Sequence, residues 1–84
     1  MGRVMRIDNY LKVSRLIKRR TVANDACDGD RITVNGKVVK ASYQVKIGDI
    51  IEIHFGEHTL KVEVLKIDDN VGKADAPEMY RELK

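Results

Sequence analysis

The residues best suited to bind a ligand are basic side chains near the start of the chain. Residues 1–20 contain seven lysines and arginines and one acid, Asp8, whereas residues 21–84 contain nine basic and twelve acidic residues. The net charge of +3 is therefore the sum of a strongly basic segment and a mildly acidic remainder. Clustered basic side chains attract polyanions, and arginine also forms paired hydrogen bonds with phosphate. This distribution predicts a nucleic acid as the partner.

Other residues with binding or catalytic chemistry favour ordinary structural roles. Asp25, Asp28 and Asp30 lack the alternating ligands and the closing glutamate of a calcium loop, so an acidic helix end accounts for them better. His54 and His58 lack a third ligand for zinc. No glycine-rich phosphate loop and no nucleophile–base pair stands out. We therefore expect a binding protein and not an enzyme, with no metal and no cofactor.

Composition predicts one small folded domain. The chain has 84 residues, 43% of them hydrophobic, so its core must be thin. No apolar run approaches the length of a membrane span, and no apolar segment follows the first arginines as in a secretory signal. The single cysteine, Cys27, excludes an intramolecular disulfide and favours a small buried side chain. These features predict a cytoplasmic protein, with a monomer as the default.

Two helices are predicted to position the basic residues. After a frayed extension at 1–4, a helix is expected at about 8–15, with Asp8 as its N-cap. The period breaks at 16–17, which predicts a tight corner, and a second helix follows at about 19–29. Its start carries two arginines that oppose the helix dipole, which is weak support for a role outside folding. The expected buried residues are Ile7, Tyr10, Leu11 and Ser14 in the first helix and Val22, Ala23, Ala26 and Cys27 in the second.

The rest of the chain reads as short antiparallel strands. Asn35-Gly36 between 32–34 and 37–39 is a strong signal for a tight hairpin, because both turn residues need positive φ. A second turn is expected at Gly48, and strands at 51–55 and 60–64 flank a turn at 56–58. Residues 68–76 are polar and expected to be mobile, and Pro77 can start a short helix reaching Leu83. The predicted organisation is an α+β domain at 1–67 and a tail at 68–84.

The motifs of residues 5–55, in their order, resemble the S4 RNA-binding domain. The resemblance is carried by ArgIleAspAsnTyrLeu at 6–11, SerArg at 14–15, ArgArgThrValAla at 19–23, ValAsnGly at 34–36 and LysIleGlyAsp at 46–49. It implies the αL fold, in which two helices pack on a small antiparallel sheet and present basic residues to structured RNA. One departure is that Gly29 lies one place early and Asp30 fills the glycine position before the hairpin. Because aspartate tolerates the left-handed conformation, we expect the turn to survive with a small shift.

The resemblance also implies which residues contact RNA. Lys12 is the least certain in its helix because the helical phase can turn it sideways. Lys37 and Lys40 flank the hairpin that lies near RNA in the family, although edge-strand lysines that prevent aggregation are an alternative. The expected RNA-binding residues are Arg6, Lys12, Arg15, Lys18, Arg19, Arg20, Lys37 and Lys40.

The resemblance extends from residue 5 to residue 84 for the stand-alone S4 proteins of Gram-positive bacteria, which include the RqcP-like ribosome quality-control factors. It implies contact with ribosomal RNA and peptidyl-tRNA on the large ribosomal subunit, and an RqcH-type partner that extends the stalled chain. Three alternatives remain open. They are a heat-shock-type recycling or biogenesis factor, a severed targeting module of a pseudouridine synthase, and a protein adaptor that uses the acidic strands.

Overall fold

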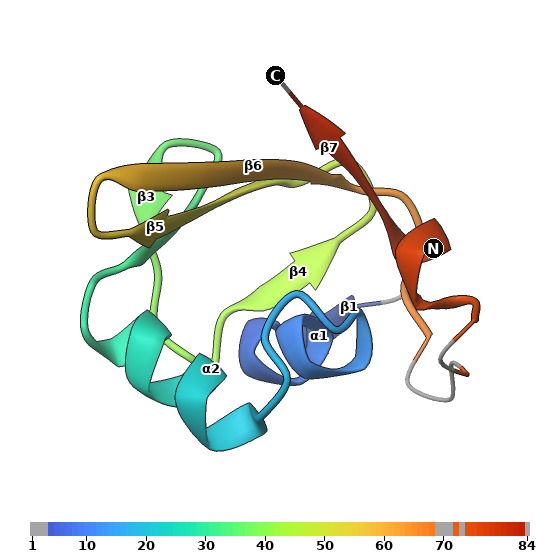
Figure 1. The fold of residues 1–84 in the computed structure, drawn as a ribbon, viewed down its shortest axis with the longest axis horizontal. Helices are drawn as coiled ribbons and strands as arrows, with labels where there is room; N and C mark the ends of the chain where they lie inside the picture. Colours follow the sequence, from blue (N-terminus) through green and yellow to red (C-terminus); the bar gives the residue numbers. More distant parts are fainter. Residues whose placement is uncertain (1–3, 69–71, 73, 84) are drawn as a thin grey trace.

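A computed structural model describes residues 4–68, 72 and 74–83, and places two short helices beneath a twisted antiparallel sheet (Figure 1). The elements in chain order are β1 (Val4–Arg6), α1 (Ile7–Val13), α2 (Arg20–Asp28), β2 (Ile32–Val34), β3 (Lys37–Val38), β4 (Gln44–Lys46), β5 (Ile50–Phe55), β6 (His58–Val64), the 3-10 helix η1 (Ala76–Met79) and β7 (Tyr80–Leu83). The expected α+β architecture is confirmed. Neither α-helix is long or apolar enough to cross a membrane.

The main sheet has five strands in the order β3-β2-β5-β6-β7, with all neighbours antiparallel. A separate two-stranded sheet joins β1 to β4, with Val4 opposite Lys46. This small sheet fixes the start of α1, because the Ile7 amide donates to the Tyr43 carbonyl at 2.7 Å. The direction in which α1 leaves the sheet is therefore set by residues 36 to 42 positions further along the chain.

The core lies between the helices and the inner face of the sheet. Alternation along β5 and β6 places Ile51, Ile53, Val62 and Val64 inward. The helices contribute fully buried side chains, and α1 packs directly on α2. The buried apolar helix residues are Ile7, Tyr10, Leu11, Ala23 and Cys27.

Residues in the left-handed conformation shape several of the connections. The hairpin turn has Asn35 at φ 53° and Gly36 at φ 85°, as predicted, and Gly48 has φ 95° in the second predicted turn. Asp30 has φ 63°, so aspartate does take the left-handed position after α2 that glycine takes in the family pattern. The turn after α2 therefore survives with aspartate at this position, as expected.

Several expectations about the helices were wrong in detail. Helix α1 begins at Ile7, so Arg6 occupies the N-cap position and Asp8 lies inside the first turn. Val22 is exposed to 51%, although the period of α2 predicted it to be buried. Val22 faces a hollow beyond the edge of the core. Periodicity predicts which face of a helix is apolar, but it does not show whether other residues cover that face.

The C-terminal residues also differ from expectation. The helix predicted after Pro77 ends at Met79, and the remaining residues form strand β7, which pairs with β6. The mobile stretch expected at 68–76 lies partly outside the described residues, as do residues 1–3 of the expected extension. Within the described part of that stretch, the Ala76 amide donates to the Gly72 carbonyl at 3.1 Å.

Candidate nucleic-acid interface

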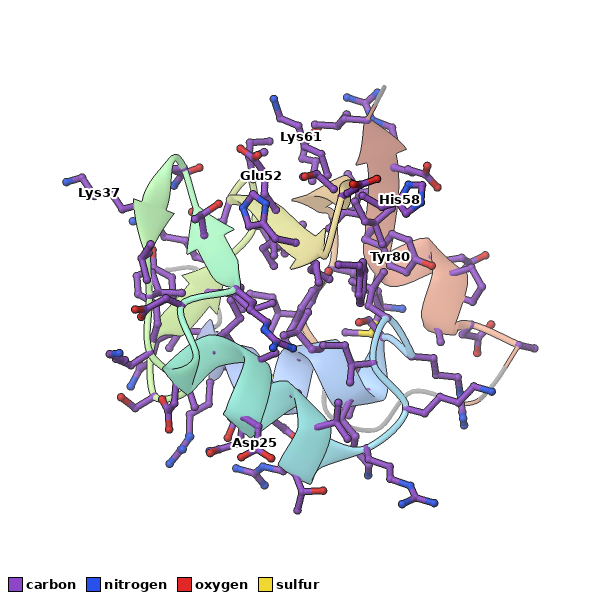
Figure 2. All side chains as sticks on the ribbon, turned by 60° about the vertical axis from the view of Figure 1, so that its left-hand side comes forward. Asp25, Lys37, Glu52, His58, Lys61 and Tyr80 are labelled. Atoms are coloured by element: carbon purple, nitrogen blue, oxygen red, sulfur yellow. The ribbon has the colours of Figure 1, made fainter. Side chains whose placement is uncertain are left out.

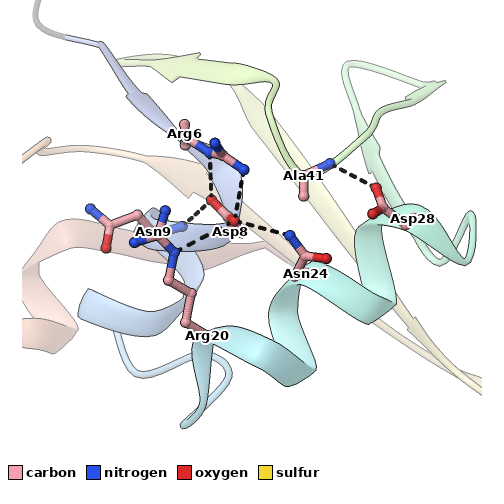
Figure 3. A network of polar contacts seen from close by, with 7 residues as sticks. All are labelled: Arg6, Asp8, Asn9, Arg20, Asn24, Asp28 and Ala41. Carbon is pink, nitrogen blue, oxygen red and sulfur yellow. Dashed lines mark hydrogen bonds and ion pairs between the residues drawn. The ribbon is translucent and has the colours of Figure 1, made fainter.

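Two arginines from different elements converge on one buried carboxylate (Figure 3). Arg6 ends β1, and its Nε and Nη2 each donate to the Asp8 carboxylate at 3.2 Å. Arg20 opens α2, and its Nε lies 3.5 Å from Asp8 Oδ2. The Asp8 side chain is 2% exposed, whereas the Arg6 and Arg20 side chains are 48% and 51% exposed. The carboxylate is thus enclosed while both guanidinium groups remain open to solvent.

The remaining acceptor capacity of Asp8 is also used. Its Oδ1 accepts from the Asn9 amide at 2.8 Å, and its Oδ2 accepts from Asn24 Nδ2 at 3.4 Å. Burial alone would raise the pKa of Asp8. The hydrogen bonds from Asn24, Arg6 and the Asn9 amide, together with the charge of Arg20, outweigh burial and lower that pKa. Asp8 therefore stays ionised at neutral pH and holds both arginines electrostatically.

The segment between the helices presents further cations. Arg15 directly follows the C-cap residue of α1 and has φ 64°, Lys18 lies in the corner, and Arg19 is the N-cap residue of α2. Lys12 is exposed in the last turn of α1. All four are exposed, and none forms an ion pair with another residue in the part of the chain that the structure describes. Their charges are available to a ligand.

The two hairpin lysines lie apart from this group. Lys40 is engaged near the other end of α2, where its Nζ lies 3.1 Å from Asp30 Oδ1 and 3.4 Å from the Asp28 carbonyl oxygen. Lys37 projects from β3, at the opposite end of the molecule from Asp25 of α2 (Figure 2). The structure brings six of the eight predicted residues to the helices and their connection, and leaves Lys37 and Lys40 elsewhere.

Sequence reasoning missed the role of Asp8. The sequence predicts Asp8 as a helix cap, whereas its side chain accepts a hydrogen bond from Asn24 of the second helix. The signal available was that Asp8 is the single acid among seven basic residues. An acid retained in such a segment is well placed to order the bases around it.

Two hollows adjoin α2. One hollow, of about 330 Å³, is lined by Asp8 and its side-chain partners and by two further residues of α2. Its lining residues are Arg6, Asp8, Arg20, Thr21, Asn24 and Asp25. The other, of about 460 Å³, lies between α2 and β5 and is lined mainly by apolar residues, including Leu16, Val22 and Phe55. Only the smaller hollow is bordered by the paired arginines. No cluster of three or more potential metal ligands occurs among the described residues.

Fold and surface together define a small RNA-binding module of the αL type. Residues 5–51 match the model of the S4 domain, and the chain belongs to the S4 domain family. Within it, the chain groups with proteins named RQC P-site tRNA stabilizing factor. The protein of that name from Streptococcus pneumoniae is 53% identical over 76 residues, which cover 90% of this chain and 86% of the relative. The Bacillus subtilis protein is 48% identical over 80 residues, covering 95% and 93%.

Solved structures agree with the fold. Heat shock protein 15 from Vibrio cholerae, whose structure is described as trimeric, matches with a TM-score of 0.87 at 30% identity. The match covers 96% of this chain and 83% of that protein. The expected S4 fold, including the strands after residue 55, is therefore found in a solved relative.

Proposed function

We propose that this protein binds ribosomal RNA and tRNA on the large ribosomal subunit and stabilises the P-site tRNA during ribosome-associated quality control. The observation that carries the proposal is near full-length identity of 45–53% to factors named for that role. The exposed cations of the helical layer supply a physical basis, because phosphate neutralisation releases counterions and drives binding. The proposed action is binding alone, without catalysis, in the cytoplasm.

The proposed RNA-binding surface consists of the helical cations, with the hairpin lysines as a separate patch. Arg6 and Arg20 form one pair around Asp8. Arg15, Lys18 and Arg19 lie on the segment that connects the two helices. Lys40 would have to leave Asp30 to reach RNA, so we expect a smaller effect from it. The surface comprises Arg6, Lys12, Arg15, Lys18, Arg19 and Arg20, and the separate patch comprises Lys37 and Lys40.

The test measures co-sedimentation with large ribosomal subunits, with and without peptidyl-tRNA in the P site. We expect stronger binding when the tRNA is present, and a loss of about ten-fold for Arg15→Ala or Lys18→Ala, because each removes one charged contact. Lys61→Ala is the matched control. It removes the same charge from β6, at the opposite end of the molecule from α2 (Figure 2).

Equal loss of binding in Lys61→Ala and Lys18→Ala would contradict the assigned surface, because charge alone would then matter and not its position. Equal binding to large subunits with and without P-site tRNA would contradict the stabilising role. The protein would then be an S4 protein that binds RNA in general.

A heat-shock-type recycling or biogenesis role is a second candidate, favoured by the structural match to heat shock protein 15. We propose that the two roles differ in whether this protein acts together with an RqcH-type partner. Extension of a stalled chain by that partner should require this protein only in quality control. Deleting the gene should abolish such extension under the first function and leave it unchanged under the second.

We further propose that the binding unit is a monomer. The described residues form one continuous core with its sheet edges at the short β3 and at β7. Because the Vibrio cholerae relative is described as trimeric, sedimentation velocity over a concentration series is the direct check. A trimer at micromolar concentration would overturn this proposal without affecting RNA binding.

A further inference from the structure

Asp8 has an unusual environment for a residue on an RNA-binding face. It is an acid, it is 1% exposed, and its acceptors are occupied by donors from β1, α1 and α2. An isolated acid near RNA would repel phosphate and weaken binding. Here the charge is enclosed and faces the arginines, so its effect on a ligand must pass through them.

The arginines keep most of their donors after pairing with Asp8. A guanidinium group has five N–H donors. Arg6 gives two nitrogens to the carboxylate, and Arg20 approaches it through Nε alone. Two positive charges share one negative charge, so the cluster keeps a net positive charge and several outward N–H groups. Such groups match phosphate oxygens in pairs.

The cluster also borders a space of suitable size. The 330 Å³ hollow lies beside Arg6 and Arg20, with Thr21, Asn24 and the carboxylate residue Asp25 also lining it. A free arginine side chain loses rotamer entropy when it is ordered. Asp8 orders both arginines before a ligand arrives, so less of that entropy is lost on binding.

We propose that Asp8 is the positioning residue of the RNA-binding surface, and that it holds Arg6 and Arg20 as a pair which binds one RNA phosphate at the adjoining hollow. The proposal rests on the RNA binding proposed above and deepens it. It reverses the effect expected from charge alone. Removing an acid from an RNA-binding face should strengthen binding by electrostatics, whereas removing the group that orders the arginines should weaken it.

The test compares Asp8→Asn with Asp25→Asn, using large ribosomal subunits that carry P-site tRNA. Both variants lose one negative charge, and both residues line the hollow, but Asp25 forms no ion pair with the described residues. We expect Asp8→Asn to weaken binding by about ten-fold. Asp25→Asn should leave binding unchanged or strengthen it by a few-fold. Equal behaviour of the two variants would overturn the proposal.

A double-mutant cycle separates positioning from a loss of fold. Asp8→Asn is repeated in a protein that also carries Arg6→Ala and Arg20→Ala. If Asp8 acts through the arginines, it should cause no further weakening there. A ten-fold loss that persists in this background would overturn the proposal and indicate a general structural role. If Arg6→Ala and Arg20→Ala together leave binding unchanged, these arginines do not contact RNA. That outcome contradicts the assigned RNA-binding surface, and with it the positioning role of Asp8.

A second pair of variants avoids changing the buried carboxylate, and decides the question if Asp8→Asn does not fold. Arg20→Lys keeps the charge but loses the planar guanidinium group and its paired N–H donors. We therefore expect several-fold weaker binding. Arg19→Lys makes the same change at the neighbouring exposed cation of the surface, which Asp8 does not hold, so it should weaken binding less than Arg20→Lys does. Equal effects at both positions would contradict positioning of Arg20.

Discussion

Arg15 has a backbone conformation that glycine adopts without strain and arginine does not. Its φ of 64° lies in the left-handed region, where an L-residue loses roughly 1 kcal/mol or more. It directly follows the α1 C-cap, a place where glycine is common. A long cation at this position costs stability, which suggests that the side chain is needed for binding.

Replacing Arg15 by glycine or by alanine separates strain from charge. Both variants remove the cation, so both should weaken RNA binding equally. Arg15→Gly also relieves the left-handed strain, so its free energy of unfolding should exceed that of Arg15→Ala by about 1 kcal/mol. Urea unfolding measures the difference. Equal stability of the two variants would show that the backbone is not strained at this residue.

The ionisation of Asp8 predicts a pH dependence. Its pKa is lowered in the folded protein, so the folded chain binds this proton less well than the unfolded chain does. The stabilisation is therefore complete above the unfolded pKa of about 3.9 and is lost as the pH falls through the lower folded pKa. The gap in unfolding free energy between wild type and Asp8→Asn should narrow from pH 6 to pH 3.

Urea titrations at several pH values test this expectation. Asp25→Asn provides the baseline for removing an acid from α2 outside the buried cluster. A gap between wild type and Asp8→Asn that stays constant down to pH 3 would show that the ionised carboxylate contributes nothing to stability.

At the scale of elements, α1 is tied to the C-terminal segment by one buried hydrogen bond. Tyr10 is fully buried, and its hydroxyl donates to the Met79 carbonyl at 2.7 Å. That carbonyl also accepts from the Leu65 and Lys66 amides, at 2.8 and 3.1 Å. The segment directly after β6, the η1 turn and the first helix therefore meet at a single oxygen.

Tyr10→Phe should lower the free energy of unfolding by about 1 kcal/mol, since one buried hydrogen bond is lost. The loss should not greatly exceed this value, because the Met79 carbonyl keeps two donors. Amide exchange in η1 and β7 should accelerate more than exchange in β5. Tyr43→Phe is the control, as its hydroxyl reaches Asp49 only at 3.5 Å. A larger loss in the control would show that the Tyr10 contact is not the important one.

The elements that could be predicted are those with strong local signals. The Asn35-Gly36 hairpin and the alternation of β5 and β6 were found because neighbouring residues determine them. Strands β1 and β4 were missed because each has only three residues, too few for a period, and they pair across forty positions. The Asp8–Arg20 pair was missed because it depends on how the helices cross. The basic segment itself was visible in the sequence, but its internal order was not.

At the scale of the whole molecule, burial of Cys27 gives a probe of global stability. Its side chain is fully buried on α2, and burial, followed by the nearby charges of Asp8 and Asp28, raises the pKa of the thiol to about 12. Iodoacetamide at pH 8 should therefore react on the order of a thousand-fold slower than with a free thiol, because the domain must open first. Urea should accelerate the reaction in parallel with unfolding. Fast modification in the native protein would indicate local opening of α2.

The net charge of +3 understates how strongly this molecule should respond to salt. The domain measures 29 × 25 × 24 Å, about three times the Debye length of about 8 Å at physiological salt. The acidic sheet residues are thus largely screened from a ligand at the helices, and the local cations dominate.

About five phosphate contacts predict that affinity for large subunits falls by a few hundred-fold between about 50 and 200 mM salt. Lys18→Ala should reduce the slope of log affinity against log salt by about one, while Lys61→Ala on β6 should leave it unchanged. Co-sedimentation over a salt series measures both. A flat dependence would mean that the chain reaches the ribosome through protein contacts on its sheet, which is the adaptor alternative, and the helical cations would then need another explanation.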